Sequence, residues 1–428
     1  MSDRTAAPMD PALRSWRTRI FASTYLCYAG MYFCRKPFYV AKASLGEHFH
    51  LSATALGWLG SAYLVAYTIG QFVAGGVGNK VGPRLTLIGG MAASVVANLV
   101  FGVTDVYALF VVAMIVNGLG QSTGWSGGVG TMGNWFHKRE RGTVMGWWAT
   151  NYQLGGFAAT FLASWLLGHY GFRSSFFGGA VVLFAVLVFF IPNQRNRPED
   201  VGLPPVEDPE EEDAAGEPVE PAAANSGWSR DAIITVLLVG TFYFFVKFIR
   251  YALWSWVPYF LKLNYSMTAE NSGYFSTLFD LAGIPGVVIA GWLSDRFFRS
   301  RRTIVSFVFL LGLTGSCLVM WKLGGTAVWI FATSLALIGF TLYGPDALMT
   351  GAGAIEVGSR ANATLAAGII NGMGQVGAVV QELAIGKLYD KLHGDLGPIF
   401  MLLLGSAVMS AVLLGVVLIR NRLGRSSL

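Results

Sequence analysis

The chain has 428 residues, of which 54% are hydrophobic and only 13% are charged, about half the charged fraction of an average soluble domain. This composition excludes an ordinary soluble domain and indicates a polytopic α-helical membrane protein. The formal net charge of +6 does not call for a nucleic-acid partner, because Lys and Arg in the loops of a membrane protein serve to orient it in the bilayer.

Apolar segments long enough to cross a bilayer as a helix of about 20 residues recur along the whole chain. One long polar stretch, residues 193–230, divides the series. We predict twelve spanning helices, six before this stretch and six after it. They lie near residues 20–40, 56–77, 84–103, 106–130, 143–167, 174–192, 231–261, 271–293, 303–322, 327–349, 361–386 and 396–419.

The polar residues 1–19 precede the first span and form a predicted cytoplasmic N-terminus. Within this span, Arg35 and Lys36 place two adjacent cations where hydrocarbon is expected. A charge at the centre of a spanning helix costs about 2.5–3.5 kcal/mol on insertion scales, so such a residue usually faces a water-filled cavity or a bound anion. The alternative is that Lys36 and Pro37 mark a break near the outer membrane surface.

Polar side chains at helical spacing mark one face of several spans. Tyr67 and Gln71 lie four residues apart on the second span, and Asn371 and Gln375 do so on the eleventh. Polar groups on a spanning helix point away from lipid. These residues therefore either line a cavity or form hydrogen bonds between helices, and the sequence leaves both interpretations open.

The stretch 193–230 holds ten of the 24 acidic residues and only three of the 30 basic ones. This proline-rich, acidic composition is typical of a disordered, solvated tether. It predicts a cytoplasmic linker between an N-terminal six-helix bundle over residues 20–192 and a C-terminal bundle over residues 231–420. A cytoplasmic tail at residues 421–428 follows.

The second half repeats the cationic feature of the first. Lys247 and Arg250 lie in the seventh span, and Arg250 follows Arg35 by 215 positions in a chain of 428. Each arginine stands at the same point of its own half. We interpret the two arginines as the two sides of one anion site.

A second repeat lies in the loops after the second and eighth spans. Both loops combine a glycine, an acid or amide, and a base at matching spacing, and the copies are about 216 residues apart. A short basic turn of this kind holds two spans together through charged hydrogen bonds. The residues are Gly75, Asn79, Lys80 and Arg84 in the first loop, and Gly291, Asp295 and Arg296 in the second.

Basic residues outside the spans are distributed unevenly. If both termini are cytoplasmic, the cytoplasmic side carries most of them, and the other side carries only a handful, such as Lys262 and Lys322. Positive charge is concentrated on the cytoplasmic side of membrane proteins. We therefore predict a multi-pass protein of the inner (plasma) membrane with both termini in the cytoplasm.

Two sets of six spans, a central linker and a paired loop motif resemble the major facilitator superfamily over about residues 15–422. The resemblance implies two helical bundles related by a pseudo-two-fold axis along the membrane normal. It also implies a substrate site between the bundles that opens to either side of the membrane in turn. The five histidines lie mainly in loops, without metal-ligand spacing or a nucleophile–base pair, so we expect no enzyme activity, no metal and no cofactor.

Several stretches resemble one branch of this superfamily, the organophosphate:phosphate antiporters. Arg35 with Lys36 matches the family's site arginine in the first span, and Arg250 with Tyr251 matches its partner in the seventh. Residues 282–286 and 291–295 match the eighth span. The resemblance implies exchange of a phosphorylated small organic anion for inorganic phosphate, with one arginine from each bundle on the phosphate.

The resemblance is incomplete at two positions. Tyr152 stands where a substrate-contacting histidine is expected, and Gln71 replaces a lysine found in several bacterial members. Lys247, one turn before Arg250 on the same helix face, and Asp280 in the eighth span resemble the eukaryotic sugar-phosphate exchangers. We hypothesise that Lys247 replaces the missing lysine, with Asp280 as its counter-ion in the empty site. The alternative is a structural Lys247–Asp280 pair that never contacts ligand.

These residues predict a monomeric carrier whose partners are a small phosphorylated anion, inorganic phosphate and the lipid bilayer. Repulsion between Arg35 and Arg250 is expected to hold back the empty carrier and so to favour exchange. Two alternatives remain open: a hexose-phosphate sensor of the same fold, and a proton-coupled symporter of an organic anion. The symporter alternative rests on Asp280, Asp346 and Glu382 in the second half.

Overall fold

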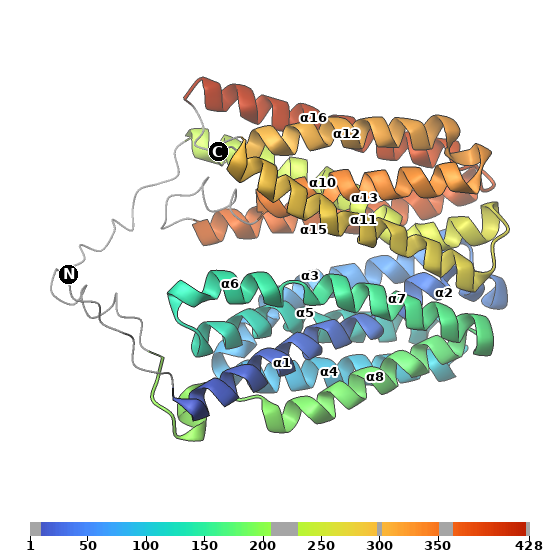
Figure 1. Ribbon diagram of the computed structural model, residues 1–428. Helices are drawn as coiled ribbons and strands as arrows, with labels where there is room; N and C mark the ends of the chain where they lie inside the picture. The colour runs from blue at the N-terminus through green and yellow to red at the C-terminus, as the bar shows by residue number, and fades with distance from the viewer. Residues whose placement is uncertain (1–9, 207–229, 298–301, 351–362, 425–428) are drawn as a thin grey trace.

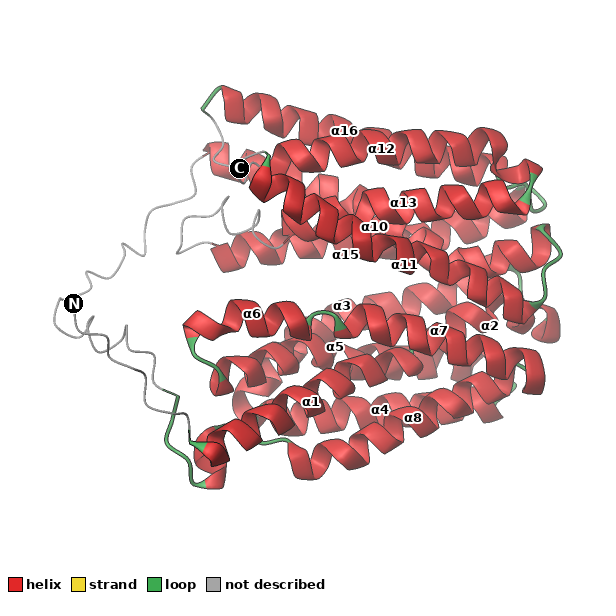
Figure 2. Cartoon of the chain, in the orientation of Figure 1, coloured by secondary structure: helices red, strands yellow, loops and turns green. Residues whose placement is uncertain are grey.

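The computed structural model describes residues 10–206, 230–297, 302–350 and 363–424. Within this part of the chain the secondary structure is helical, and no strand is present (Figure 2). The helices of the first half are α1 (Pro11–Phe33), α2 (Lys36–Phe49), α3 (Ala53–Val81), α4 (Pro83–Val103), α5 (Tyr107–Trp135), α6 (Lys138–Trp148), α7 (Asn151–Tyr170) and α8 (Phe172–Asn193), followed by the short η1 (Pro198–Val201).

The helices of the second half are α10 (Arg230–Asn264), α11 (Ala269–Arg296), α12 (Arg302–Leu323), α13 (Val328–Thr350), α15 (Ala363–Lys391) and α16 (Gly397–Arg422), with the short η2 (Gly324–Thr326) before α13. Figure 1 shows the two halves as two stacked groups of roughly parallel helices. Each of the twelve predicted spans coincides with one of these helices or with a broken pair. Most of the predicted acidic linker, residues 207–229, lies outside the described residues.

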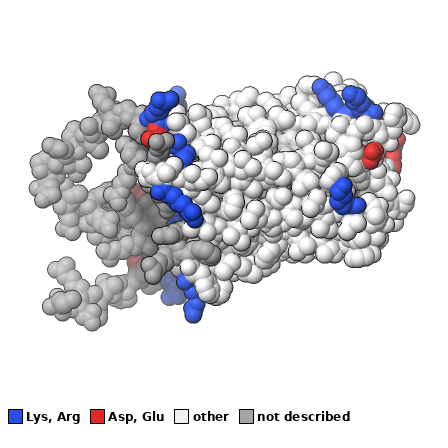
Figure 3. Space-filling model, turned by 90° about the horizontal axis from the view of Figure 1, so that it is seen from above, with Lys and Arg blue, Asp and Glu red and all other residues white. Residues whose placement is uncertain are grey.

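Eight of the described helices are by themselves long and apolar enough to cross a membrane. The distribution of charged residues on the surface also agrees with a membrane-spanning protein. On the face that Figure 3 shows, Lys and Arg gather toward the two ends, with an uncharged band between them. This arrangement fits a bilayer around the middle of the molecule.

The first span differs from its prediction, because it consists of two helices that together cover residues 11–49. The helix breaks at Cys34 and Arg35, and Pro37 lies in the first turn of α2, where its missing N–H costs little. The carbonyl oxygen of Cys34 accepts hydrogen bonds from the amides of Asn98 (3.0 Å) and Asn117 (2.8 Å). Since these amides lie on α4 and α5, the break is inside the bundle and not at the membrane surface.

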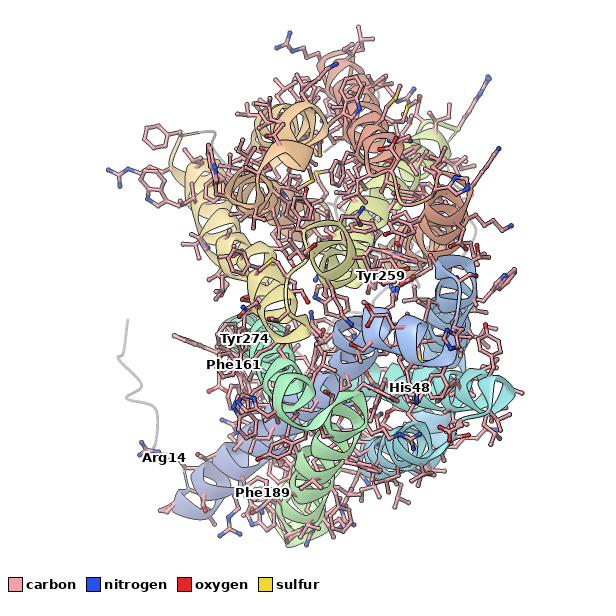
Figure 4. All side chains as sticks on the ribbon, turned by 90° about the vertical axis from the view of Figure 1, so that its right-hand side faces the viewer. Arg14, His48, Phe161, Phe189, Tyr259 and Tyr274 are labelled. Atoms are coloured by element: carbon pink, nitrogen blue, oxygen red, sulfur yellow. The ribbon has the colours of Figure 1, made fainter. Side chains whose placement is uncertain are left out.

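The two halves pack closely against each other at one end, where α2 ends and α3 begins. Phe161 of α7 stacks on Tyr274 of α11 with ring centroids 4.8 Å apart (Figure 4). A Cβ atom on Gly57 of α3 would lie 2.5 Å from the carbonyl oxygen of Glu382 on α15, so only glycine permits this approach of the two backbones. We call this end, formed by the beginnings of α3 and α11 and the ends of α2 and α15, the closed end.

Polar contacts between the halves reinforce the closed end. Asp390 of α15 accepts hydrogen bonds from the backbone N–H groups of Ala53 (2.9 Å) and Thr54 (2.7 Å) at the start of α3. Ser52 caps the same helix through its side chain, which accepts from the N–H of Ala55 at 3.1 Å. The first amides of α3 are therefore satisfied partly by its own half and partly by the other.

A fully buried ion pair also joins the halves. Lys42 of α2 donates to Glu382 of α15 at 2.9 Å and to the hydroxyl of Ser255 on α10 at 2.5 Å. Ser255 in turn donates to the second oxygen of Glu382 at 2.5 Å. Lys42, Ser255 and Glu382 are all 0% exposed, so both charges depend on each other for compensation.

Candidate functional site

A cavity of ≈ 490 Å³ lies between the two halves. It lies away from the closed end, beyond the residues through which the halves contact each other. On α3 the lining residues follow, in the chain, the residues that contact the other half, and on α7, α10 and α15 they precede them. On all four helices the lining residues are therefore further from the closed end. The lining residues are Tyr28, Tyr32, Arg35, Tyr67, Gln71, Trp125, Tyr152, Tyr243, Lys247, Arg250, Tyr251, Tyr343, Asp346, Ala347, Gly368, Ile370, Asn371 and Gln375.

Arg35 enters the cavity from the break between α1 and α2. Its Nε donates to Oε1 of Gln121 at 2.7 Å, and its guanidinium carbon lies 4.7 Å from the ring centroid of Tyr32 and 5.1 Å from that of Tyr67. Its Nη2 is buried and has no hydrogen-bond partner among the described residues. An unpaired guanidinium nitrogen of this kind is prepared to donate to an anion in the cavity.

Arg250 enters the cavity from the other half, on α10. Its Nη1 donates to Oδ2 of Asp346 on α13 at 2.5 Å, and its guanidinium carbon lies 4.7 Å from the ring centroid of Tyr343. The two predicted arginines therefore face one cavity, but only Arg250 has a carboxylate partner in the described part of the chain. The expected repulsion between them is consequently reduced, because Asp346 neutralises Arg250.

Lys247 lies one turn before Arg250 and also lines the cavity. Its ammonium is 5.2 Å from the ring centroids of both Tyr243 and Tyr251, a distance at which aromatic faces attract a cation. The hypothesis that Asp280 is its counter-ion is wrong for this structure, as is the alternative of a structural Lys247–Asp280 pair.

Asp280 instead belongs to a network around Lys36. It accepts hydrogen bonds from Lys36 (3.4 Å), from Nε1 of Trp254 (3.2 Å) and from the hydroxyl of Tyr343 (2.5 Å). Lys36 also lies 3.7 Å from the ring centroid of Trp254. The Lys36–Asp280 pair joins the two halves, and neither residue is among the lining residues of the cavity. Asp280 is connected to the cavity wall through the hydroxyl of Tyr343.

Most of the predicted binding residues come together. Arg35, Arg250, Lys247, Tyr152, Gln71, Tyr67, Asn371 and Gln375 all line the cavity, whereas Asp280 does not. Sequence reasoning missed Asp346 as a member of the site, although an acidic residue after Gly344 and Pro345 in an apolar span was a usable signal. Of the tyrosines that line the cavity, it predicted Tyr67 and Tyr152. It missed the others, which lie on too many helices to show a single sequence pattern: Tyr28, Tyr32, Tyr243, Tyr251 and Tyr343.

None of the residues of the loop motif is among the described residues that line this cavity. Arg84 donates from its side chain to the carbonyl of Ile191 at 2.9 Å, and its backbone N–H donates to Asn196 at 2.8 Å, so it ties α4 to the end of α8. Lys80, Gly291 and Arg296 lie at the ends of α3 and α11. Gly75 and Asn79 lie on α3 and Asp295 lies on α11, but the surroundings of these three residues are outside what the structure describes.

The described part of the chain holds no group of three or more His, Cys, Asp or Glu residues suited to a metal ion. The described lining residues combine guanidinium, ammonium, phenol and amide donors with the carboxylate of Asp346. These groups suit the binding of an oxyanion with a polar remainder, since charged donors bind phosphate or carboxylate strongly.

A family model described as the Major Facilitator Superfamily matches residues 24–381. A glycerol-3-phosphate transporter of Bacillus subtilis is 30% identical over 422 residues, covering 95% of this chain and 93% of that protein. Sugar phosphate exchanger 3 of Bos taurus is 28% identical over 436 residues, covering 87% of each chain. Membrane sensor protein UhpC of Escherichia coli is 27% identical over 417 residues, covering 95% of this chain and 93% of the sensor.

Among solved structures, a bacterial homologue of the human lysosomal transporter Spinster, in an inward-facing and occupied conformation, superposes with a TM-score of 0.73. The superposition covers 96% of this chain and 98% of that one, at 12% sequence identity. A likeness at this level of identity shows the fold alone.

Proposed function

The chain belongs to the major facilitator superfamily and, within it, to the organophosphate:phosphate antiporter family, and from this premise we propose that it exchanges a phosphorylated small organic anion for inorganic phosphate. The observation that supports this proposal is the cavity between the halves, which receives one arginine from each. The buried, unpartnered Nη2 of Arg35 supplies a free donor for the phosphate. Membership in this family of transporters also agrees with the prediction that the chain is not an enzyme.

The positions of the cationic groups support a binding mode in which the phosphate bridges the halves. Arg35 is anchored to Gln121 in the first half, while Lys247 and Arg250 lie on α10 of the second. A phosphate carries about −1.5 to −2 charge at pH 7 and three acceptor oxygens. Contacts to both sides at once would lower the cost of bringing two cationic surfaces together, so the loaded carrier closes around the anion more readily than the empty one.

The closed end supports alternating access as the mode of transport. Contacts between the two halves, made by described residues, close this side of the cavity. The cavity is therefore accessible from the opposite side, where the chain termini lie. In the proposed cycle these contacts break and the opposite side closes, so that the cavity faces the other side of the membrane. With the termini in the cytoplasm, as the basic loops indicate, the structure corresponds to a carrier open toward the cell interior.

The test is counterflow in proteoliposomes that contain the purified protein and internal phosphate. Labelled phosphate uptake should be driven by internal phosphate and inhibited by external phosphate esters, which we would compare as a panel of glycerol phosphate, hexose phosphates and phosphoglycerates. Protein-free vesicles and vesicles without internal phosphate are the controls. Uptake that ignores internal phosphate but collapses with a proton uncoupler would support a proton-coupled symporter and contradict this proposal.

A sensor function is the second candidate, because the similarity to the membrane sensor protein UhpC extends over 95% of this chain. A sensor of the same fold would bind the phosphate ester in the same cavity without completing the cycle. Ligand binding in detergent combined with absent counterflow would therefore identify a sensor, whereas robust counterflow identifies the carrier. Whether it is a carrier or a sensor, we propose that the protein is a monomer in the plasma membrane.

A further inference from the structure

The two arginines of the cavity differ in their hydrogen-bond partners, although they occupy matching positions in the two halves of the sequence. Arg250 donates to Asp346 at 2.5 Å, and the side chain of Asp346 is only 8% exposed. Arg35 faces Gln121 and the rings of Tyr32 and Tyr67. Asp346 is thus a carboxylate built into the anion site itself, on α13, opposite the helix that carries Arg250.

The charges around the cavity can be compared with the charge of a substrate. Among the described lining residues, Arg35, Lys247 and Arg250 are cations and Asp346 is an anion, so these residues together carry a net charge of +2. Lys36 and Asp280, which do not line the cavity, pair with each other at 3.4 Å and cancel. A phosphate monoester brings about −1.5 to −2 at pH 7, so an ester on an uncharged carbon skeleton neutralises the cavity.

We propose that Asp346 determines specificity by limiting the charge of the anion that the cavity accepts. It matches the site to a dianion and disfavours phosphate esters that carry a further carboxylate. A trianion would leave one negative charge uncompensated when the halves close around it, and uncompensated buried charge is costly. This inference rests on the proposed function and adds to it the charge class of the substrate.

The test compares two phosphate esters of equal length that differ in charge. Glycerol 3-phosphate ends in a hydroxymethyl group, and 3-phosphoglycerate ends in a carboxylate. For each protein we would measure the inhibition constants of both esters against labelled-phosphate uptake at one pH, and their binding in detergent by tryptophan fluorescence, since Trp125 lines the cavity. Asp346→Asn should shift the ratio of the two constants toward 3-phosphoglycerate by about tenfold, the effect of 1.4 kcal/mol in differential binding.

Three matched variants separate charge from structure. Asp346→Glu keeps the carboxylate and should keep the wild-type ratio. Lys247→Gln lowers the net charge and should shift the ratio the opposite way, away from 3-phosphoglycerate. The double variant Lys247→Gln/Asp346→Asn restores a net charge of +2 and should return the ratio to the wild-type value. If Asp346 merely held Arg250 in position, Asp346→Asn would weaken both esters equally and the double variant would not restore the ratio.

The outcomes distinguish this inference from the proposed function. If wild-type protein binds neither ester and shows no phosphate counterflow, the proposed function is wrong and the inference falls with it. If wild-type protein binds phosphate esters but the ratio is unchanged in Asp346→Asn, only the inference is overturned. Should Asp346→Asn not fold, an unchanged ratio in Lys247→Gln overturns the inference in its place.

Discussion

The two arginines of the cavity have different partners in the two halves. Arg35 is held by Gln121 and aromatic rings and keeps a free donor, whereas Arg250 shares its guanidinium with Asp346. A guanidinium presents a planar set of donors to a phosphate that an ammonium does not reproduce. The identity of each cation should therefore matter as much as its charge.

Arg35→Lys and Arg250→Lys should each lower phosphate exchange by more than tenfold, because the planar set of donors that we propose for the phosphate becomes a single point charge. Counterflow in proteoliposomes measures the effect, and the amount of protein in the membrane should stay at the wild-type level. Arg14→Lys, on the exposed first turns of α1, is the matched control and should exchange normally. Wild-type exchange by both cavity variants would refute the arginine site.

Lys247→Gln should weaken substrate binding by about tenfold while leaving the folded yield unchanged. It removes a cation from the cavity wall but breaks no ion pair of the described residues, since the ammonium rests against the rings of Tyr243 and Tyr251. Binding titrations and size-exclusion chromatography measure the two quantities. Intact affinity together with a lower yield would instead assign Lys247 a structural role.

The break in the first span determines where Arg35 lies. Its break places Arg35 at the start of α2, and α2 then continues to Phe49 because it packs against α10 and α11 of the other half instead of lipid. The prediction ended this span at residue 40, two residues before Lys42. Lys42 is in fact fully buried against Glu382 and Ser255, partners more than 200 residues away that no local pattern reveals.

The crossing of α3 and α15 depends on Gly57. Gly57→Ala should lower exchange at least tenfold, because the added Cβ would lie 2.5 Å from a backbone oxygen of α15 and would keep the closed end from packing. Gly89→Ala, on α4 with no atom within 4 Å of the added Cβ, is the control and should exchange normally. Equal exchange by the two variants would show that the close crossing is not needed.

The whole molecule shows which features the sequence could predict. The twelve spans, the two halves and the convergence of Arg35 with Arg250 followed from hydropathy and from charges at matching positions in each half. The counter-ions did not follow. Lys36, Lys247 and Arg250 are all cations within reach of α11 or α13, and the rotation and register of packed helices decide that Asp280 pairs with Lys36 and Asp346 with Arg250.

Removing one partner of the buried Lys42–Glu382 pair should lower the free energy of unfolding strongly, whereas replacing both with apolar residues should lower it little. Glu382→Gln leaves a buried ammonium without a counter-charge and should lower stability by about 3–5 kcal/mol, whereas Lys42→Met/Glu382→Met should regain most of it. Thermal unfolding in lipid nanodiscs measures both. A double variant no more stable than Glu382→Gln would show that this pair is not the source of the loss.

The carboxylate of Asp390 ties the start of α3 to the opposite half, and this contact gives the transport cycle a local isotopic signature. When the closed end opens, the amides of Ala53 and Thr54 lose their acceptor and should exchange with deuterium, while that of Ala55, bonded to Ser52 within its own half, stays protected. Hydrogen exchange at these three neighbouring amides would thus report the fraction of molecules that face outward. Saturating phosphate should change that fraction. Asp390→Ala, which removes both acceptor oxygens, should let the amides of Ala53 and Thr54 exchange whether or not phosphate is present, while that of Ala55 stays protected.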